Sequence, residues 1–191
     1  MDSYTDIVRK YFISDILSTY NAIPSFCYLT LAISLIIGTI AFWRFFEPQK
    51  AFRFSMRLFL FEYLLLLFSS TLIFREPAQV SKCNYSLFWS YEAIIQGDHS
   101  LIIDNTMNIL AFIPVGFFLC GSVAGIKWKT IALLGCCCSL LIEFIQLQTA
   151  RGFSEFDDVI HNTLGCMIGY GSFCLVMLVY EKVSKRRMAV L

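Results

Sequence analysis

The sequence predicts an all-α fold, a polytopic membrane helix bundle with about five transmembrane helices. Hydrophobic residues make up 58% of the 191 residues and charged residues 15%, and the mean hydropathy is +0.68. Soluble domains are closer to half apolar and about one quarter charged. Backbone inside lipid must be helical or closed into a barrel, and a crossing helix needs about 20 residues. The apolar segments that meet this length are 24–43, 56–74, 101–122, 130–149 and 158–180.

These segments define a transmembrane domain over residues 23–180, with a short segment on either side. In residues 1–22, Val8, Phe12 and Ile16 recur at a spacing of four. This pattern fits a short amphipathic helix at the membrane interface or a flexible tail. Acidic residues in this segment, and the long apolar run after it, argue against a cleaved signal peptide. Residues 181–191 form a basic tail.

The basic residues predict the orientation of the bundle, because connections rich in Lys and Arg stay in the cytoplasm. Ten of the 15 Lys and Arg residues lie in the connections 44–57 and 123–129 and in the tail after residue 180. This distribution places the N-terminus outside and the C-terminus in the cytoplasm, as five crossings require. The connection 75–100 and the one that precedes residue 158 are then expected outside.

Composition also limits the partners and cofactors. The formal net charge is +1 and no basic motif or glycine-rich phosphate loop is present, so nothing indicates nucleic-acid binding. Most of the eight cysteines lie in apolar runs, where Cys behaves as a small hydrophobic residue. The CCC run at 136–138 lacks the ligand spacing of a zinc site. We expect no disulfide framework, no structural metal and no cofactor.

Polar residues within the apolar segments gather at one level near the predicted outer surface. Asn108 and Glu143 each lie about six residues, or roughly 9 Å, from the outer end of their helix, and Gln146 follows Glu143 by one turn. Asp158 and Asn162 share one helix face at i,i+4 spacing. Charged groups in membrane helices face the bundle interior or a wet cavity. The pattern therefore predicts a polar pocket that opens to the outside.

Two arginines lie just beyond this polar level, at the predicted outer ends of two helices. Arg75 follows the second segment and Arg151 the fourth. A guanidinium group at such a pocket is suited to phosphate or carboxylate. The alternative for Arg151 is an ion pair with Glu155 or Asp157 in a solvated loop.

The candidate residues also have purely structural interpretations. Asp158 fits an ordinary helix N-cap, and Asn108 and Asn162 fit interhelical hydrogen bonds. His161 is one residue off the Asp158–Asn162 face and fits packing better than general-base catalysis. Glu62, near the predicted cytoplasmic end of its segment, is interpreted as structural.

Several blocks of sequence resemble the VanZ-like family. They are NILAFIPVGFF at 108–118, EFIQ at 143–146, and RGF followed by DDVIHNTLGCMIGY at 157–170. Upstream, RE at 75–76 and NYSLFWSYEAI at 84–94 are similar to the family's pattern. One departure is the run Ser86-Leu87-Phe88, in which the family's pattern has a proline before the phenylalanine. The blocks occur in order, and the resemblance covers roughly residues 58–180. It adds Asn84 to the candidate site.

The resemblance implies a small multi-pass protein of the bacterial cell membrane. The namesake of the family is associated with low-level resistance to the lipoglycopeptide teicoplanin, and the resemblance supplies no mechanism. One hypothesis is a pocket that binds membrane lipids, namely the headgroup of a lipid-linked cell-wall precursor, or a lipoglycopeptide. The ligand-binding residues would then be Arg75, Asn84, Asn108, Gln146, Arg151 and Asn162.

A second hypothesis is an intramembrane enzyme that acts on an envelope lipid. Glu143 and Asp158 would be its catalytic acid/base pair, with different pKa values set by burial and by arginine. The same two carboxylates would also suit a divalent cation. A third interpretation is that the polar level only locks the packing of the helices.

Overall fold

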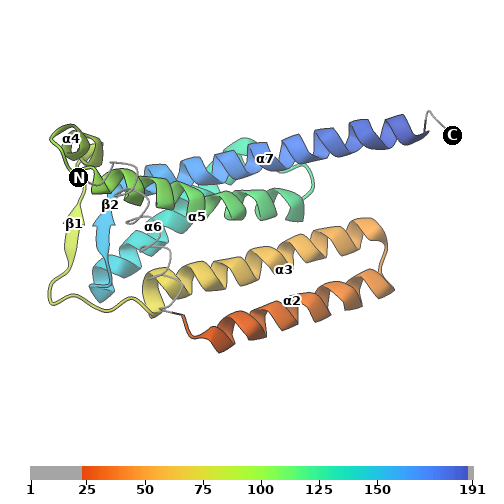
Figure 1. The fold of residues 1–191 in the computed structure, drawn as a ribbon, viewed down its shortest axis with the longest axis horizontal. Coiled ribbons are helices and arrows are strands. Elements are labelled where there is room, and N and C mark those ends of the chain that lie inside the picture. The colour runs from red at the N-terminus through yellow and green to blue at the C-terminus, as the bar shows by residue number, and fades with distance from the viewer. Residues whose placement is uncertain (1–22, 189–191) are drawn as a thin grey trace, which may run out of the picture.

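The computed structural model describes residues 23–188, so the expected segment 1–22 lies outside it. Within this range the chain forms six α-helices, one short π-helix and two short strands (Figure 1). The elements are α2 (Ser25–Phe45), α3 (Pro48–Phe68), the π-helix η1 (Ser69–Ile73), β1 (Lys82–Asn84), α4 (Trp89–Ile95), α5 (Ser100–Ser122), α6 (Trp128–Thr149), β2 (Phe153–Glu155) and α7 (Phe156–Met188).

Five of the helices are long and apolar enough to cross a membrane, which confirms the predicted all-α bundle. They are α2, α3 together with η1, α5, α6 and α7. Their outer faces are apolar. On α2, for example, Ile36, Ile37 and Ile40 are 56%, 62% and 65% exposed. Such a face is unfavourable in water and suits contact with lipid chains.

Two helices extend beyond the apolar segments that predicted them. α3 begins at Pro48 rather than near residue 56, because proline at the first position is pre-organised for a helix and nothing after it stops one. Lys50 and Arg53 therefore lie on α3 and not in a loop. At the other end of the chain, the α7 backbone continues to Met188. Hydropathy marks the part of a helix that suits lipid, and not where the helix ends.

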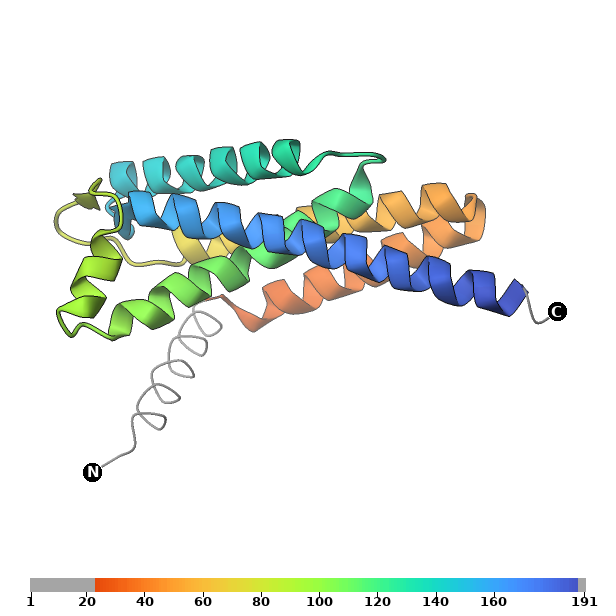
Figure 2. The same cartoon turned by 90° about the horizontal axis from the view of Figure 1, so that it is seen from above.

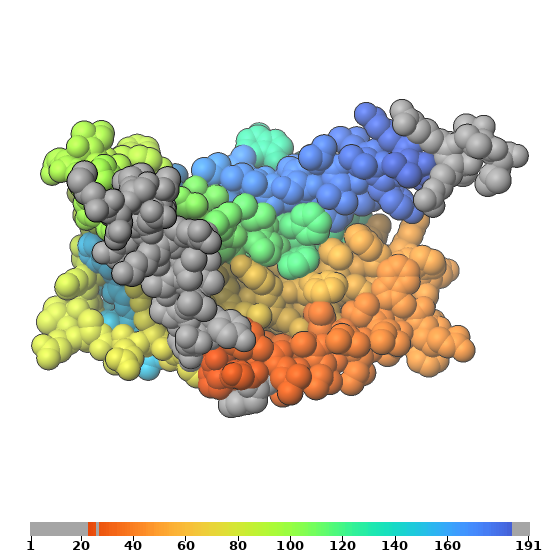
Figure 3. All heavy atoms as spheres, in the orientation of Figure 1, coloured from red at the N-terminus to blue at the C-terminus, as the bar shows by residue number. Residues whose placement is uncertain are grey.

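The long helices pack side by side in one bundle. α5 lies between α7 and α3, α6 lies against α7, and α2 lies against α3 (Figure 2). The face in Figure 3 shows α7, α5, α3 and α2 in this order from top to bottom. β1, β2 and α4 lie at one end of the bundle, whereas the α2–α3 turn and the end of α7 lie at the other (Figure 1).

Glycines bring α5 and α7 into close contact. A Cβ atom added at Gly169 would fall on the carbonyl oxygen of Ile113, and one at Gly165 on that of Ile109. Small residues at a helix interface allow this approach of two backbones. The glycine face of α7 is consequently covered by α5.

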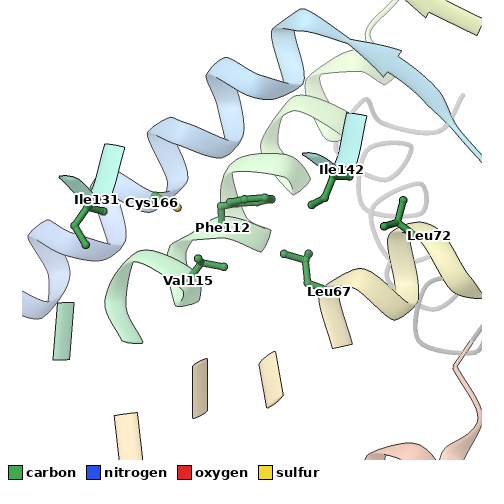
Figure 4. Close-up of a cluster of buried hydrophobic side chains, with 7 residues drawn as sticks. All are labelled: Leu67, Leu72, Phe112, Val115, Ile131, Ile142 and Cys166. Carbon is green, nitrogen blue, oxygen red and sulfur yellow. The ribbon is translucent and has the colours of Figure 1, made fainter. Parts of the chain in front are cut away.

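A cluster of buried apolar side chains joins four long helices and η1 (Figure 4). Its members are Leu67, Leu72, Phe112, Val115, Ile131, Ile142 and Cys166. α2 supplies none of them and is attached mainly through α3. There the Ser34 hydroxyl donates to the Glu62 carboxylate at 2.6 Å, and Glu62 is only 7% exposed. This contact supports the structural interpretation of Glu62.

Candidate functional site

A small cavity of about 70 Å³ lies among η1, α5, α6 and α7. Three residues of the core cluster also line the cavity, namely Leu67, Phe112 and Ile142. The polar side chains that line it are Thr71, Arg75, Asn108, Glu143, Gln146, Asp158 and Asn162. Six of the eight candidate residues from the sequence therefore meet at one place, and Asn84 and Arg151 do not line the cavity.

The two candidate catalytic carboxylates lie on the same cavity and interact electrostatically. Glu143 is 7% exposed. Its Oε2 accepts the backbone N–H of Glu155 at 2.9 Å, and the Ser154 hydroxyl also donates to it. Asp158, in the first turn of α7, accepts a hydrogen bond from the Asn108 side chain on α5. β2 thus orients one carboxylate and α5 the other.

The two buried amides differ in how fully they are hydrogen-bonded. Gln146 and Asn162 are each 4% exposed. The Gln146 amide donates to the Thr71 carbonyl at 3.4 Å. The Asn162 amide nitrogen donates to the Ser139 hydroxyl at 2.8 Å, but its Oδ1 has no hydrogen-bond partner within residues 23–188. Asn162 therefore presents an unmet acceptor at the cavity.

Arg75 is the exposed group at the edge of the cavity. It follows the π-helix η1, which continues from the end of α3 and places Thr71 at the cavity. Single π-helical turns of this kind are frequent at functional sites. Gly152 packs against it with φ of 139°. A Cβ atom there would come within 3.1 Å of both Arg75 Nη1 and the Gln146 amide. The absence of a side chain at Gly152 therefore leaves space for the side chains of Arg75 and Gln146.

Arg151 and Asn84 support the surrounding backbone. Arg151 Nη1 donates to the carbonyls of Leu72 at 2.7 Å and Ile73 at 2.6 Å, so it caps the helix end that carries Arg75. Asn84 ends β1, and its Oδ1 accepts the backbone N–H of Ser86 at 3.0 Å. β1 pairs in parallel with β2, which is the strand that contacts Glu143.

Asp157 anchors α4 and does not pair with Arg151, contrary to the loop interpretation. It is 1% exposed, and its carboxylate accepts the backbone N–H groups of Phe88 at 2.6 Å and Ser90 at 3.0 Å. The Ser90 hydroxyl donates to it at 2.6 Å, and Asn105 on α5 donates to that hydroxyl at 3.1 Å. A carboxylate from α7 therefore caps the N-terminus of α4, where negative charge is favourable.

Consecutive residues of α7 therefore face different neighbours. Asp158 and Asn162 face the cavity, while Asp157 and His161 form a second i,i+4 stripe that faces α4. The Tyr91 hydroxyl and His161 Nε2 are 2.8 Å apart, and His161 is 1% exposed, as a packing role requires. The second stripe was visible in the sequence, but its partner was not, because α4 was not anticipated within the connection 75–100.

Glu155 lies between the cavity and α4. The Trp89 indole N–H donates to its carboxylate at 3.1 Å. Burial raises the pKa of Glu155 to about 8, and the charge of Asp158 adds to this effect. The raised pKa means that ionisation of Glu155 is more costly in the folded protein than in the unfolded chain.

We expect this pKa to appear in the pH dependence of stability. Between the ordinary pKa of a glutamate, about 4.3, and about 8, the folded protein keeps a proton that the unfolded chain has lost. Stability therefore falls as pH rises through this window. Glu155→Gln keeps an acceptor for Trp89 and should flatten the fall, measured as melting temperature against pH. Glu76→Gln, at an exposed position, should leave it unchanged; equal slopes in all three proteins would contradict the assignment.

The fold and the cavity together define a polytopic helical membrane protein with a polar site enclosed near one end of its bundle. A family model described as VanZ/LLP1 matches residues 26–178, which is most of the chain. The chain belongs to the VanZ/LLP1 family. The match includes nearly all of α2, which precedes the region in which the sequence blocks resemble the family. Searches of curated proteins and of solved structures found no match.

Proposed function

We propose that this protein binds a small polar group of a cell-envelope lipid or lipid-linked precursor in the cavity lined by Glu143 and Asp158. The observation that carries the proposal is the convergence of seven polar side chains on one cavity from four separate segments. Polar residues whose role is to hold helices together need only form contacts in pairs, and they do not need to surround a cavity. Acidic residues that line a cavity inside a membrane bundle are instead typical of a functional site.

The size of the cavity favours a small headgroup. Its volume is about 70 Å³, whereas a cavity of ~150 Å³ accommodates benzene and drug-sized ligands occupy at least ~300 Å³. A lipoglycopeptide is larger than any of these and does not fit. Resistance to a teicoplanin-type compound would then follow from an action on a membrane component, and not from enclosure of the antibiotic.

The surroundings of the cavity are suited to a lipid. Apolar side chains cover the outside of the bundle, and Arg75 at the cavity edge is placed to contact a phosphate. We further propose a bacterial cell membrane as the location, on the basis of the family. The end with α4 would face outwards, because most basic residues lie towards the opposite end.

Susceptibility to teicoplanin tests the proposal. In a sensitive Gram-positive host, wild-type protein should raise the inhibitory concentration, and Glu143→Gln and Asp158→Asn should return it to that of the empty vector. Both substitutions keep the side-chain shape, remove the charge and replace one acceptor oxygen by an NH2 group. Membrane levels are matched by immunoblot. Glu62→Gln is the matched control, because Glu62 and Glu143 are both 7% exposed and Glu62 is not in the cavity lining.

Two results would contradict parts of this proposal. If all four proteins protect equally, the cavity does not contribute to resistance. If the wild type gives no protection, family membership indicates the architecture without the resistance, and other envelope-active compounds become the ligands to test.

A second candidate function is acid/base catalysis on the same headgroup. It is favoured by the shared position of Glu143 and Asp158, whose surroundings differ in burial and in hydrogen-bond donors. Such differences let one carboxyl act as acid and the other as base. Purified protein incubated with bacterial lipid extract should then form a product that mass spectrometry detects and that Glu143→Gln abolishes. Binding without any product would leave the first function alone.

A further inference from the structure

We infer that the group bound in the cavity is a primary ammonium, such as the headgroup amine of an aminophospholipid. This inference rests on the proposed function and specifies its ligand. It depends on three features of the site: an unmet hydrogen-bond acceptor, an excess of acidic groups, and the small volume.

The unmet acceptor is Asn162 Oδ1. Buried polar atoms nearly always have a hydrogen-bond partner, yet this atom has none within the described residues. The amide nitrogen of Asn162 is engaged by Ser139 at 2.8 Å, so the oxygen is the group left for the cavity. A ligand that forms a hydrogen bond with this oxygen must carry an N–H or O–H donor. An ionised phosphodiester or carboxylate has no such donor.

The charges near the cavity favour a cationic donor. Glu143 and Asp158 line it, and Asp104 on α5 acts electrostatically on Asp158. Arg75 is the cationic side chain of the lining, and it lies at the exposed edge. An anion inside would add to the repulsion among these carboxylates, whereas a cation would reduce it.

A primary ammonium matches the acceptors better than other cations do. It has three N–H donors, and Glu143, Asp158 and Asn162 supply three acceptor side chains. In the described part of the chain no set of three His, Cys, Asp or Glu side chains is placed to hold a metal ion, whereas Ca²⁺ takes six to eight oxygen ligands. A quaternary ammonium has no N–H donor and is bound by aromatic cages, but Phe112 is the single aromatic side chain in this lining.

The volume sets how much of the ligand can enter. The cavity of about 70 Å³ is roughly half of one that holds benzene, so an aminoethyl group fits and a sugar does not. In a phosphatidylethanolamine headgroup the phosphate follows directly after this aminoethyl group. It would then lie at the cavity edge, next to Arg75.

Lipid retention tests the inference. The full-length purified protein is equilibrated with equal amounts of phosphatidylethanolamine, phosphatidylcholine and phosphatidylglycerol, and bound lipid is counted by native mass spectrometry. We expect about tenfold more phosphatidylethanolamine than either other lipid, because charge-assisted hydrogen bonds typically contribute at least this factor. Glu143→Gln and Asp158→Asn should remove the preference, and Glu62→Gln should keep it. Thermal unfolding confirms that the compared variants are folded.

The outcomes separate the inference from the proposed function. If the three lipids are retained equally, or phosphatidylglycerol is preferred, and Glu143→Gln lowers this retention, the headgroup site stands and the ammonium is wrong. If no retention depends on Glu143 or Asp158, both are wrong. Added ethanolamine hydrochloride distinguishes a lipid headgroup amine from a free amine as the ligand. Displacement of lipid by it supports the ammonium, and binding of it without lipid preference identifies a free amine as the ligand.

Discussion

Asp157→Ala should lower the free energy of unfolding by roughly 3–5 kcal/mol. The substitution removes a carboxylate that is 1% exposed and that accepts three hydrogen bonds from Phe88 and Ser90. Those donors would remain buried without partners. α4 should then detach, and limited proteolysis within residues 76–99 should become faster. Thermal unfolding in detergent measures the loss of stability.

Two variants control this prediction. Asp157→Asn keeps one acceptor oxygen and should lie between wild type and Asp157→Ala. Asp98→Ala removes an exposed aspartate of the same connection, whose Oδ1 accepts from Ser100 at 2.6 and 3.2 Å, and should change stability by no more than about 1 kcal/mol. If Asp157→Ala behaves like Asp98→Ala, Asp157 does not anchor α4. Because Asp157 and Asp158 are consecutive, loss of the anchor should also disturb the cavity.

Gly169→Ala should destabilise the bundle by about 3 kcal/mol, at the upper end of what overpacking costs. The new methyl group would fall on the Ile113 carbonyl oxygen, which is backbone and can move only if α5 and α7 separate. α5 carries Asn108 and α7 carries Asp158, so their separation should widen the cavity. Retention of lipid headgroups should therefore fall together with the melting temperature.

Gly171→Ala is the matched control on the same helix. A Cβ atom at Gly171 meets no atom within 4 Å, so the variant should be as stable as wild type or more stable by up to about 1 kcal/mol, since alanine favours helix over glycine. Equal melting temperatures for the two variants would show that α5 and α7 are not in close contact at Gly169.

Much of the site followed from the sequence because lipid restricts what a membrane helix can carry. Asn108, Glu143, Asp158 and Asn162 lie in apolar runs at similar distances from helix ends, and such groups must turn away from lipid. Arg151 was assigned to the ligand on similar grounds. The structure places its guanidinium on the carbonyls of Leu72 and Ile73, a contact across 78 and 79 residues that no local pattern indicates.

The number of long helices and the level of the polar residues could be predicted from the sequence, because both follow from the cost of exposing polar groups to lipid. The neighbour that each polar residue meets could not, because it depends on how the helices pack. Asp157 and Asp158 are about 100° apart on one helix, so the helical period shows that they point in different directions. It does not show that α4 lies in one direction and the cavity in the other, because these neighbours come from segments distant in the sequence.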